Sequence, residues 1–423
     1  MVETSPNGRF DVALQTRTPM AESMLSLVDL EVRRGMGVVL SGFNLEVASK
    51  DVVVLHGENG SGKSTVIESC ARLLPLEKGS IHHHGALVVD SEGRRNIPPQ
   101  PFGLTLQSNG LLGDETIENH LSTVCSLSGM KTDLSPILES YGLAHRRYDR
   151  IGQLSGGQAR KVAVIAGLLP AMLCSKPRLV FLDEPGTGLD NNALAVLASD
   201  IGRLREAGHA FVIASHHPDI LKCATRLHDL ESESQQDQTP CKPWKAIGVE
   251  ENVRLLSTKV GHRYLRSTRA GLARNGLTAL LVLGTLLAFI DPISIENPTL
   301  LVGFVLAAPF AAGLAGDPVL YLMREQRAAD WWRAHVNRLP NADFIAPILG
   351  LIFTSLGCIL FLDAFDWKLS LLGAGMVWVT LFCVRFIELS TLRLARPNAV
   401  FIRLLLPILI LPWALIVDFA ATL

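Results

Sequence analysis

The sequence predicts two parts: an α/β domain built on a partly parallel sheet, followed by an all-α transmembrane bundle. In residues 24–229, short Val/Ile/Leu runs bounded by Gly and Asp alternate with helical patterns, which is typical of an α/β domain. After residue 275 the chain holds about five apolar stretches close to the ~20 residues that cross a bilayer. The chain is 48% hydrophobic and 19% charged, with mean hydropathy +0.29, which is too apolar for a disordered chain or an ordinary soluble enzyme.

Charge and cysteine content exclude several classes of protein. The 423 residues carry a formal net charge of −1, so the chain lacks the basic excess of a nucleic-acid-binding protein. The 7 cysteines are scattered, odd in number and without C-x-x-C spacing, which argues against a disulfide framework and against a zinc cage. We expect no nucleic-acid partner and a reducing compartment for the thiols.

Shifts in composition mark the domain boundaries. Residues 1–22 form a polar tail without the apolar core of a secretory signal, and residues 23–230 form the α/β domain. Residues 231–249 are predicted to be a linker, because 231–239 are polar and acidic and bury too little surface to become ordered. Residues 250–274 are basic and amphipathic, which favours an interfacial helix over a merely solvated helix face. Residues 275–423 form the transmembrane domain.

The predicted spans are connected by loops of alternating charge. The spans are expected at about 276–290, 300–315, 344–362, 369–387 and 400–419. The loops at 291–298 and 363–367 lack Lys and Arg, whereas those at 324–338 and 393–396 are rich in Arg. The positive-inside rule therefore predicts a multi-pass protein of the cytoplasmic membrane, with the α/β domain on the cytoplasmic side.

A glycine-rich loop provides the first chemical signal. Residues 57–64 match G-x-x-x-x-G-K-[ST], follow an apolar strand-like run and precede a helical pattern. In this context backbone amides and the helix N-terminus surround phosphates, a lysine reaches the terminal phosphates, and a hydroxyl ligates Mg²⁺. The predicted nucleotide-binding residues of this segment are Gly57, Asn59, Gly60, Ser61, Gly62, Lys63, Ser64 and Thr65.

Two carboxylates follow the apolar run at 178–182. The carboxyl end of a parallel strand is where such sheets place ligand chemistry, although acids after a strand are more often a solvated turn. At this distance from a phosphate loop, Asp183 is predicted to hold Mg²⁺ and Glu184 to act as the general base on the attacking water.

Between these segments lies Leu-Ser-Gly-Gly-Gln at 154–158, and here the chain resembles the ATPase subunits of ABC transporters. The resemblance implies a cassette whose mainly parallel sheet carries antiparallel and helical subdomains, that binds ATP and Mg²⁺, and whose signature acts across a dimer. It also implies a Q-loop glutamine, Gln107, that contacts Mg²⁺, a D-loop containing Asp190, and a switch histidine, His216, at the γ-phosphate. As a second anion-binding turn at a helix N-terminus, the signature contributes Ser155, Gly156, Gly157 and Gln158.

Some features depart from this family pattern. The stretch 31–35 lacks the aromatic residue that usually stacks on adenine, so Arg33 or Arg34 is the candidate replacement.

The segment 323–327 and the residues up to Pro340 are similar to the coupling helix of exporter-type permeases. The alternative is an ordinary Arg-rich cytoplasmic loop, which the positive-inside rule also predicts.

Within the family, residues 33–62 and 155–161 resemble most the ATPase of the cytochrome c biogenesis haem exporter (CcmA type). By hydropathy and the Arg-Glu segment at 324–325, the second half resembles a CcmB-like permease. The predicted function is an ATP-driven half-transporter that works as a homodimer, or with a separate permease chain, and exports haem or another cargo of cytochrome c maturation. Lipid or hydrophobic drug export is one alternative. A mechanical ATPase that releases a membrane or extracytoplasmic partner without transport is another.

Overall fold

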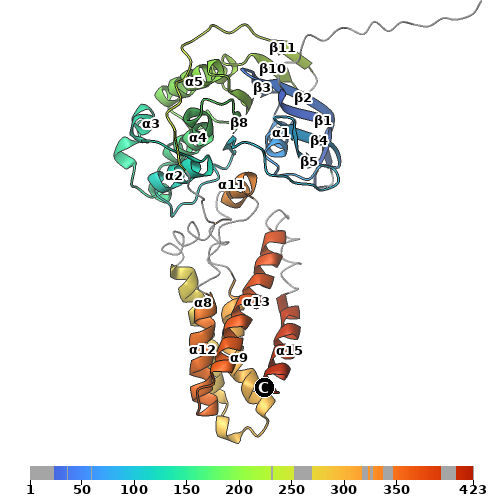
Figure 1. Ribbon diagram of the computed structural model, residues 1–423, viewed down its shortest axis with the longest axis vertical. Helices are drawn as coiled ribbons and strands as arrows, with labels where there is room; N and C mark the ends of the chain where they lie inside the picture. Colours follow the sequence, from blue (N-terminus) through green and yellow to red (C-terminus); the bar gives the residue numbers. More distant parts are fainter. Residues whose placement is uncertain are drawn as a thin grey trace, which may run out of the picture.

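The computed structural model describes the cassette half of the chain almost completely and the second half in several segments (Figure 1). The described residues are 23–35, 37–58, 60–229, 232–251, 269–316, 323, 327–336, 346–391 and 406–422. The predicted tail at 1–22 and most of the predicted interfacial helix at 250–274 lie outside these residues.

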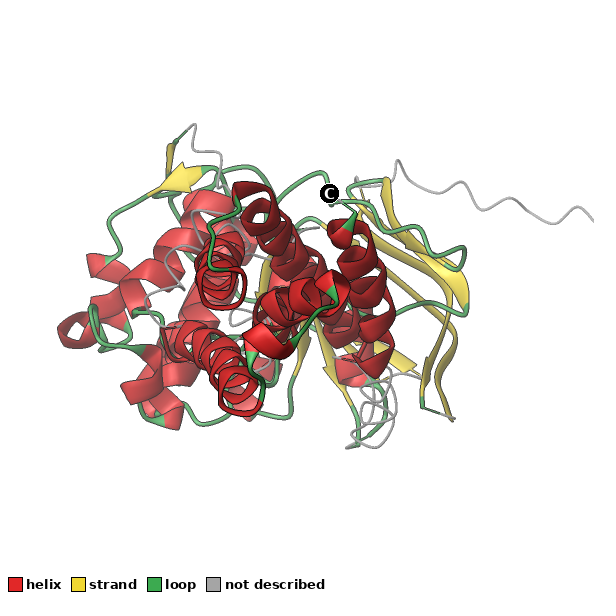
Figure 2. Ribbon diagram, turned by 90° about the horizontal axis from the view of Figure 1, so that it is seen from below, coloured by secondary structure: helices red, strands yellow, loops and turns green. Residues whose placement is uncertain are grey.

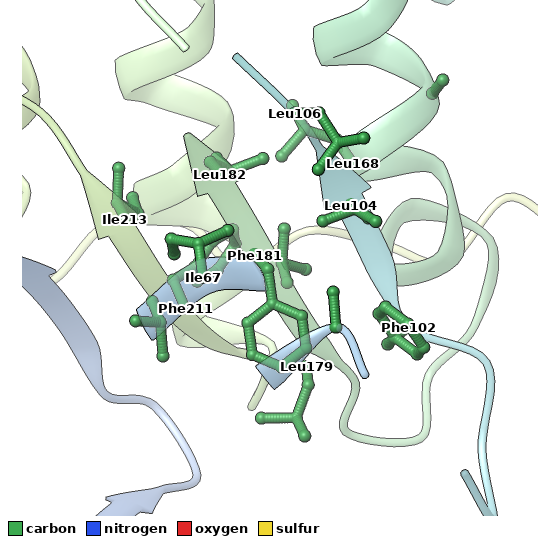
Figure 3. Packing of buried hydrophobic residues seen from close by; sticks show 14 of the residues in the cluster. Ile67, Phe102, Leu104, Leu106, Leu168, Leu179, Phe181, Leu182, Phe211 and Ile213 are labelled. Carbon is green, nitrogen blue, oxygen red and sulfur yellow. The ribbon is translucent and has the colours of Figure 1, made fainter. Parts of the chain in front are cut away.

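A six-stranded sheet forms the centre of the α/β domain. Its strand order is β11-β10-β3-β9-β8-β6, and all neighbouring pairs are parallel except β10 and β11. Apolar runs buried on both faces are typical of such parallel strands. Phe181 and Phe211 of this sheet are fully buried, and the ring of Phe181 lies 5.5 Å from that of Phe102 (Figure 3). The strands are β3 (Val52–His56), β6 (Gly103–Thr105), β8 (Leu179–Asp183), β9 (Ala210–Ala214), β10 (Arg226–Asp229) and β11 (Ser232–Gln235).

A second, antiparallel sheet adjoins this core with the order β2-β1-β4-β5. Its alternation of buried and exposed positions in β1 and β2 fits a sheet with one face packed on the core. Its strands are β1 (Ser23–Arg34), β2 (Gly37–Ala48), β4 (Lys78–His83) and β5 (Ala86–Asp90).

Helices cover the parallel sheet and build a helical subdomain beside it (Figure 1). The helices around the sheet are α1 (Lys63–Cys70), α4 (Gly156–Leu173), α5 (Asn191–Glu206) and α6 (Pro218–Leu221). The helical subdomain contains α2 (Ile117–Leu127), α3 (Ser135–Ser140) and the 3₁₀ turns η1 (Ala144–Arg146) and η2 (Ile151–Gln153). The α/β cassette with antiparallel and helical subdomains is therefore as the sequence predicts.

The predicted linker at 231–249 is ordered against the cassette, which corrects the expectation of a free segment. Ser232–Gln235 forms β11 on the sheet edge, and the Nε1–H of Trp244 donates to the carbonyl of Met172 at 3.1 Å. Arg203 lies over the ring of Trp244 at 4.5 Å. The next strand, β12 (Val249–Glu250), pairs with β7 (Met130–Lys131) of the helical subdomain. Backbone hydrogen bonds and one aromatic anchor thus order a segment whose polarity suggested otherwise.

The described residues of the second half are mainly helical, and their apolar helices lie together beneath the cassette (Figure 1), so they stand in front of the sheets when the molecule is seen from below (Figure 2). Two of them have stretches long and apolar enough to cross a membrane by length and composition, Leu272–Phe289 and Trp367–Glu388. Three other predicted spans correspond to shorter apolar helices, and residues 400–405 of the last one lie outside the described part of the chain. The helices are α8 (Arg269–Phe289), α9 (Pro298–Leu314), α12 (Ala346–Leu362), α13 (Trp367–Thr391) and α15 (Ile410–Ala421), with the 3₁₀ turns η3 (Pro292–Ser294) and η5 (Leu406–Leu409).

Candidate functional site

The glycine-rich loop connects the carboxyl end of β3 to the N-terminus of α1. Gly57, Gly60 and Gly62 have φ angles of 132°, 90° and 108°, a backbone region that L side chains avoid. The Nζ of Lys63 donates to the carbonyls of Gly57 at 2.8 Å and Glu58 at 2.6 Å. The loop therefore curls around the lysine that begins α1, as a phosphate-binding loop requires. Asn59 lies outside the described residues.

The two predicted carboxylates lie at the end of β8, beside α1. The Oγ of Ser64 donates to Oδ1 of Asp183 at 3.1 Å. Asp183 is 1% exposed, and burial, with repulsion from Glu68 and Glu184, raises the pKa of its carboxyl to about 6. A buried carboxylate whose negative form is disfavoured in this way fits a cation site, because a bound cation would compensate the charge.

Glu184 leaves the strand in a left-handed conformation. Its φ is 47°, and its backbone N–H donates to the carbonyl of Ala214 at 2.8 Å. One carboxylate oxygen lies 3.6 Å from Nε2 of His216. The backbone turn separates the directions of the two neighbouring carboxylates, and it brings the predicted base and the predicted switch histidine together.

A cavity of about 430 Å³ lies between the glycine-rich loop and the two carboxylates; His216 is not among the residues that line it. Gln107 lines it together with Ser64 and Asp183, so the three predicted Mg²⁺ ligands face one space and offer the oxygen donors that Mg²⁺ prefers. Within the described residues, no cluster of three His, Cys, Asp or Glu side chains could hold a metal by itself. The remaining lining residues are Arg34, Val39, Gly60, Gly62, Lys63, Thr65 and Glu184.

Arg33 and Arg34 are the two candidates predicted to replace the aromatic residue that usually stacks on adenine. Arg34 lines the nucleotide cavity, and its Nη2 donates to Oε2 of Glu68 at 2.6 Å. Arg33 lines a neighbouring cavity instead. Of the two candidates, Arg34 is therefore the one placed at the nucleotide cavity.

The signature segment lies at the N-terminus of α4, away from the residues that line the cavity. Ser155 caps the helix, with its Oγ accepting from the N–H of Gln158 at 3.3 Å. The side-chain oxygen of Gln158 in turn accepts from the N–H of Ser155 at 3.0 Å. Ser155 and Gly156 are exposed. One chain therefore presents its signature outward, and the side chains of Ser155 and Gln158 are engaged in capping.

Asp190 of the predicted D-loop also serves a local structural purpose. Its Oδ1 accepts from the N–H of Ala193 at 2.8 Å, so it caps α5. Its other oxygen pairs with Nζ of Lys161 at 2.6 Å. This pair joins α4 to α5 next to the signature, and it places Asp190 outside the set that lines the cavity of its own chain.

Sequence reasoning missed Arg160, a buried arginine of α4. Its guanidinium donates to the carbonyls of Leu106 at 2.7 Å and Glu184 at 2.7 Å, and to Oδ1 of Asn109 at 2.8 Å. Burial lowers the pKa of Arg160 to about 10. Arg160 thus ties the segment around Gln107 to the end of β8. In the sequence, the signal for this role is that Arg160 lies two residues after the signature. A basic residue in a helix is usually solvated, so this position does not predict a buried arginine.

Helix α11 (Ala328–His335), in the predicted coupling segment, packs against the cassette. Trp331 and Trp332 are 2% and 3% exposed and belong to the same apolar cluster as the cassette core. The ring of Trp331 lies 5.3 Å from that of His120 in α2, and His335 stacks on Phe102 at 5.0 Å. This helix lies beneath the cassette, above the apolar helices (Figure 1), so it is a docked element and not a solvated loop.

Comparisons with known proteins identify the family of the cassette half. The ABC transporter family matches residues 40–187. The lipoprotein-releasing system ATP-binding protein LolD of Hyphomonas neptunium is 33% identical over 201 residues, which cover 46% of this chain and 86% of that protein. The pyoverdine export ATP-binding/permease protein PvdT of Pseudomonas aeruginosa is 27% identical over 227 residues, 51% of this chain, and the match spans only 33% of that relative's length. Among solved structures, a dimeric bacterial ABC transporter cassette is similar with a TM-score of 0.44 at 20% identity, covering 51% of this chain and 100% of that one.

Proposed function

Because the chain belongs to the ABC transporter family and carries its ATP-hydrolysing cassette, we propose that it is an ATP-driven half-transporter. In this proposal the cassette and the apolar helices of one chain form half of a homodimeric exporter in the cytoplasmic membrane. The observation that carries the proposal is α11, which belongs to the membrane half in sequence and packs into the core of the cassette. Closure of the cassettes would move the helices through this contact.

We propose the following division of labour at the nucleotide. Lys63 and the amides of the glycine-rich loop hold the phosphates, and Ser64, Asp183 and Gln107 hold Mg²⁺. The cation, when bound, neutralises the charge that develops on the phosphates. Glu184 takes the proton of the attacking water, and His216 orients that carboxylate and the terminal phosphate.

We also propose that two chains complete two sites. Ser155 and Gly156 are exposed on the cassette surface and line no part of the cavity of their own chain. The backbone amides of Gly156 and Gly157 at this helix N-terminus are suited to bind a phosphate of the nucleotide that a partner chain holds. The simplest partner for the cassette is a second copy of this chain. The membrane half could be completed by that second copy or by a separate permease chain.

The membrane location rests on the surface of the apolar helices. Large apolar side chains point outward from them, including Leu281 at 58% exposed, Phe382 at 62% and Leu415 at 72%. An outward apolar surface of this kind matches lipid and not water. The connections at the far end, residues 290–297 and 363–366, are short and carry no Lys or Arg. Their charge agrees with a location outside the cytoplasm.

For the cargo, we propose a hydrophobic or amphipathic molecule. The relatives are named for pyoverdine export and for lipoprotein release, which span both transport and partner release. Haem, which the resemblance to the cytochrome c biogenesis exporter suggests, stays a prediction. Mechanical release of a lipid-anchored partner is the second candidate, favoured by the identity to the lipoprotein-releasing ATPase.

The test uses inside-out vesicles that contain the full chain or its Glu184→Gln variant. We expect the wild-type chain to accumulate a fluorescent amphipathic dye when ATP and Mg²⁺ are added, and the variant to retain ATP but neither hydrolyse it nor accumulate dye. Hydrolysis without dye uptake would favour mechanical release. Covalent haem in the c-type cytochromes of the source cells, measured with the same variant at equal expression, tests the haem cargo: normal levels would remove it.

A further inference from the structure

Glu68 is a buried carboxylate of α1 that contacts two distant parts of the chain. Its side chain is 3% exposed, and its oxygens are divided between two arginines. Oε2 accepts from Nη2 of Arg34 at 2.6 Å, and Oε1 accepts from Nη1 of Arg327 at 2.5 Å. The same helix begins with Lys63 and Ser64 of the phosphate loop. Glu68 therefore lies on the element that holds the phosphates and binds the start of the docked segment.

The two arginines occupy different sites. Arg34 lines the nucleotide cavity and also a neighbouring cavity of about 530 Å³. Arg327 lines the second of these cavities and is not among the residues that line the nucleotide cavity; it lies immediately before α11 and also pairs with Asp330 at 2.7 Å. The side chains of Arg34 and Arg327 are 41% and 35% exposed, whereas that of Glu68 is enclosed. Either arginine has room to move, and the carboxylate does not.

We propose that Glu68 is a positioning residue that links occupation of the nucleotide cavity to the docking of α11, with Arg34 as the shared arginine. This inference rests on the proposed function. A triphosphate in the cavity competes with Glu68 for Arg34, because a guanidinium binds phosphate at least as well as carboxylate. When Arg34 turns to the nucleotide, both oxygens of Glu68 become available to Arg327, and a bidentate pair holds the start of α11 more firmly.

This arrangement fixes the direction of the coupling. When Arg327 is removed, Arg34 is the one of the two arginines that still pairs with Glu68. The buried carboxylate then binds Arg34 more firmly, Arg34 is less available to the nucleotide, and ATP binds more weakly. Linkage requires the reverse effect as well: ATP strengthens the contact between Glu68 and Arg327. Substitution of Glu68 by glutamine removes the competition, so the effect of Arg327 on ATP affinity disappears.

The experiment measures the dissociation constant of radiolabelled ATP for the full chain in lipid nanodiscs. We expect Arg327→Ala to raise this constant about fivefold in the wild-type background and by less than about 1.5-fold in the Glu68→Gln background. Arg95→Ala is the matched control, because Arg95 lines the same second cavity and its Nη1 bonds the carbonyl of Arg72 at 3.3 Å. That control should leave the constant unchanged.

A second background keeps the inference testable if Glu68→Gln does not fold. Arg34→Ala removes the shared arginine at a partly exposed position, and Arg327→Ala should then have no further effect on ATP affinity. An equal effect of Arg327→Ala in all backgrounds, or an equal effect of Arg95→Ala, would overturn the inference while ATP binding itself remains. If the wild-type chain bound ATP no better than Lys63→Ala, the proposed function would fail, and the inference with it.

Discussion

Replacement of Asp183 by asparagine should stabilise the cassette against unfolding while it removes hydrolysis. The pKa of Asp183 is raised from 3.8 to about 6 in the folded chain, chiefly by burial. A raised carboxyl pKa means that folding favours the protonated form. Stability contributed by this group is therefore fully present below pH ~4 and is lost as the pH rises through ~6. Asparagine has the same shape, can accept the hydrogen bond from Ser64, and carries no charge to desolvate.

The size of the effect follows from the pKa shift. A shift of about two units at about 1.4 kcal/mol each gives about 3 kcal/mol at pH 8. For a domain of this size that corresponds to a rise in Tm of roughly 6 °C or more. The assay is thermal unfolding of the full chain without nucleotide or Mg²⁺, at pH 4 and at pH 8. The gain of Asp183→Asn should appear at pH 8 and vanish at pH 4.

Asp200 of α5 provides a matched control outside the cavity. Burial raises the pKa of its carboxyl to about 6 as well, and it accepts a hydrogen bond from the hydroxyl of Tyr141 at 3.1 Å. Asp200→Asn should show the same pH-dependent gain in Tm and retain ATP hydrolysis. An Asp183→Asn variant that is less stable than the wild type at both pH values would refute the reasoning about its buried charge.

Three further predictions concern the signature, the docked helix and the buried arginine. An equal mixture of Ser155→Ala and Lys63→Ala chains should hydrolyse ATP faster than either variant alone, since one composite site keeps both intact motifs; no gain would count against sharing of sites between chains. Trp331→Ala should weaken the docking of α11 by about 3 kcal/mol or more. In the same vesicles it should lower dye transport far more than ATP hydrolysis, and a parallel fall in both would argue against coupling through α11. Arg160→Met leaves several carbonyls without a donor at about 1–3 kcal/mol each, so kcat should fall with little change in the KM for ATP, and an unchanged kcat would contradict its role in positioning Glu184.

The cassette fold and the positions of the residues around the cavity could be predicted from local patterns. The glycine-rich loop, the acids after β8 and the strand before His216 are each defined by residues close together in sequence, and parallel strands bring their carboxyl ends to one edge. Ser155, Gln158 and Asp190 stay predictions at the nucleotide, in a site shared between two chains; within their own chain their side chains cap helices. A short polar side chain at the N-terminus of a helix can cap the helix or bind a ligand there. Both roles need the same residue types at the same position, so the sequence does not distinguish them.

The contacts of Arg160, Glu68 and the linker could not be predicted. Arg160 and Glu68 depend on partners far away in sequence: Glu68 and Arg327 are 259 residues apart. An isolated charge in a helical pattern looks like a solvated position, because burial of a charge is decided by what packs over it. The linker was misjudged for a different reason: its acidic composition indicated disorder, but its backbone bonds to β10 do not depend on side-chain polarity.

The path of the linker has a mechanical consequence. After β11 the chain passes α5, where Arg203 lies over the ring of Trp244. It then leaves the cassette at the helical subdomain, where β12 pairs with β7. The point at which the chain departs toward α8 is therefore carried by the subdomain and not by the central sheet. Any rotation of that subdomain relative to the sheet moves the point from which the chain continues to the first apolar helix, so the covalent connection is a second link between the cassette and the apolar helices, in addition to the docked helix α11.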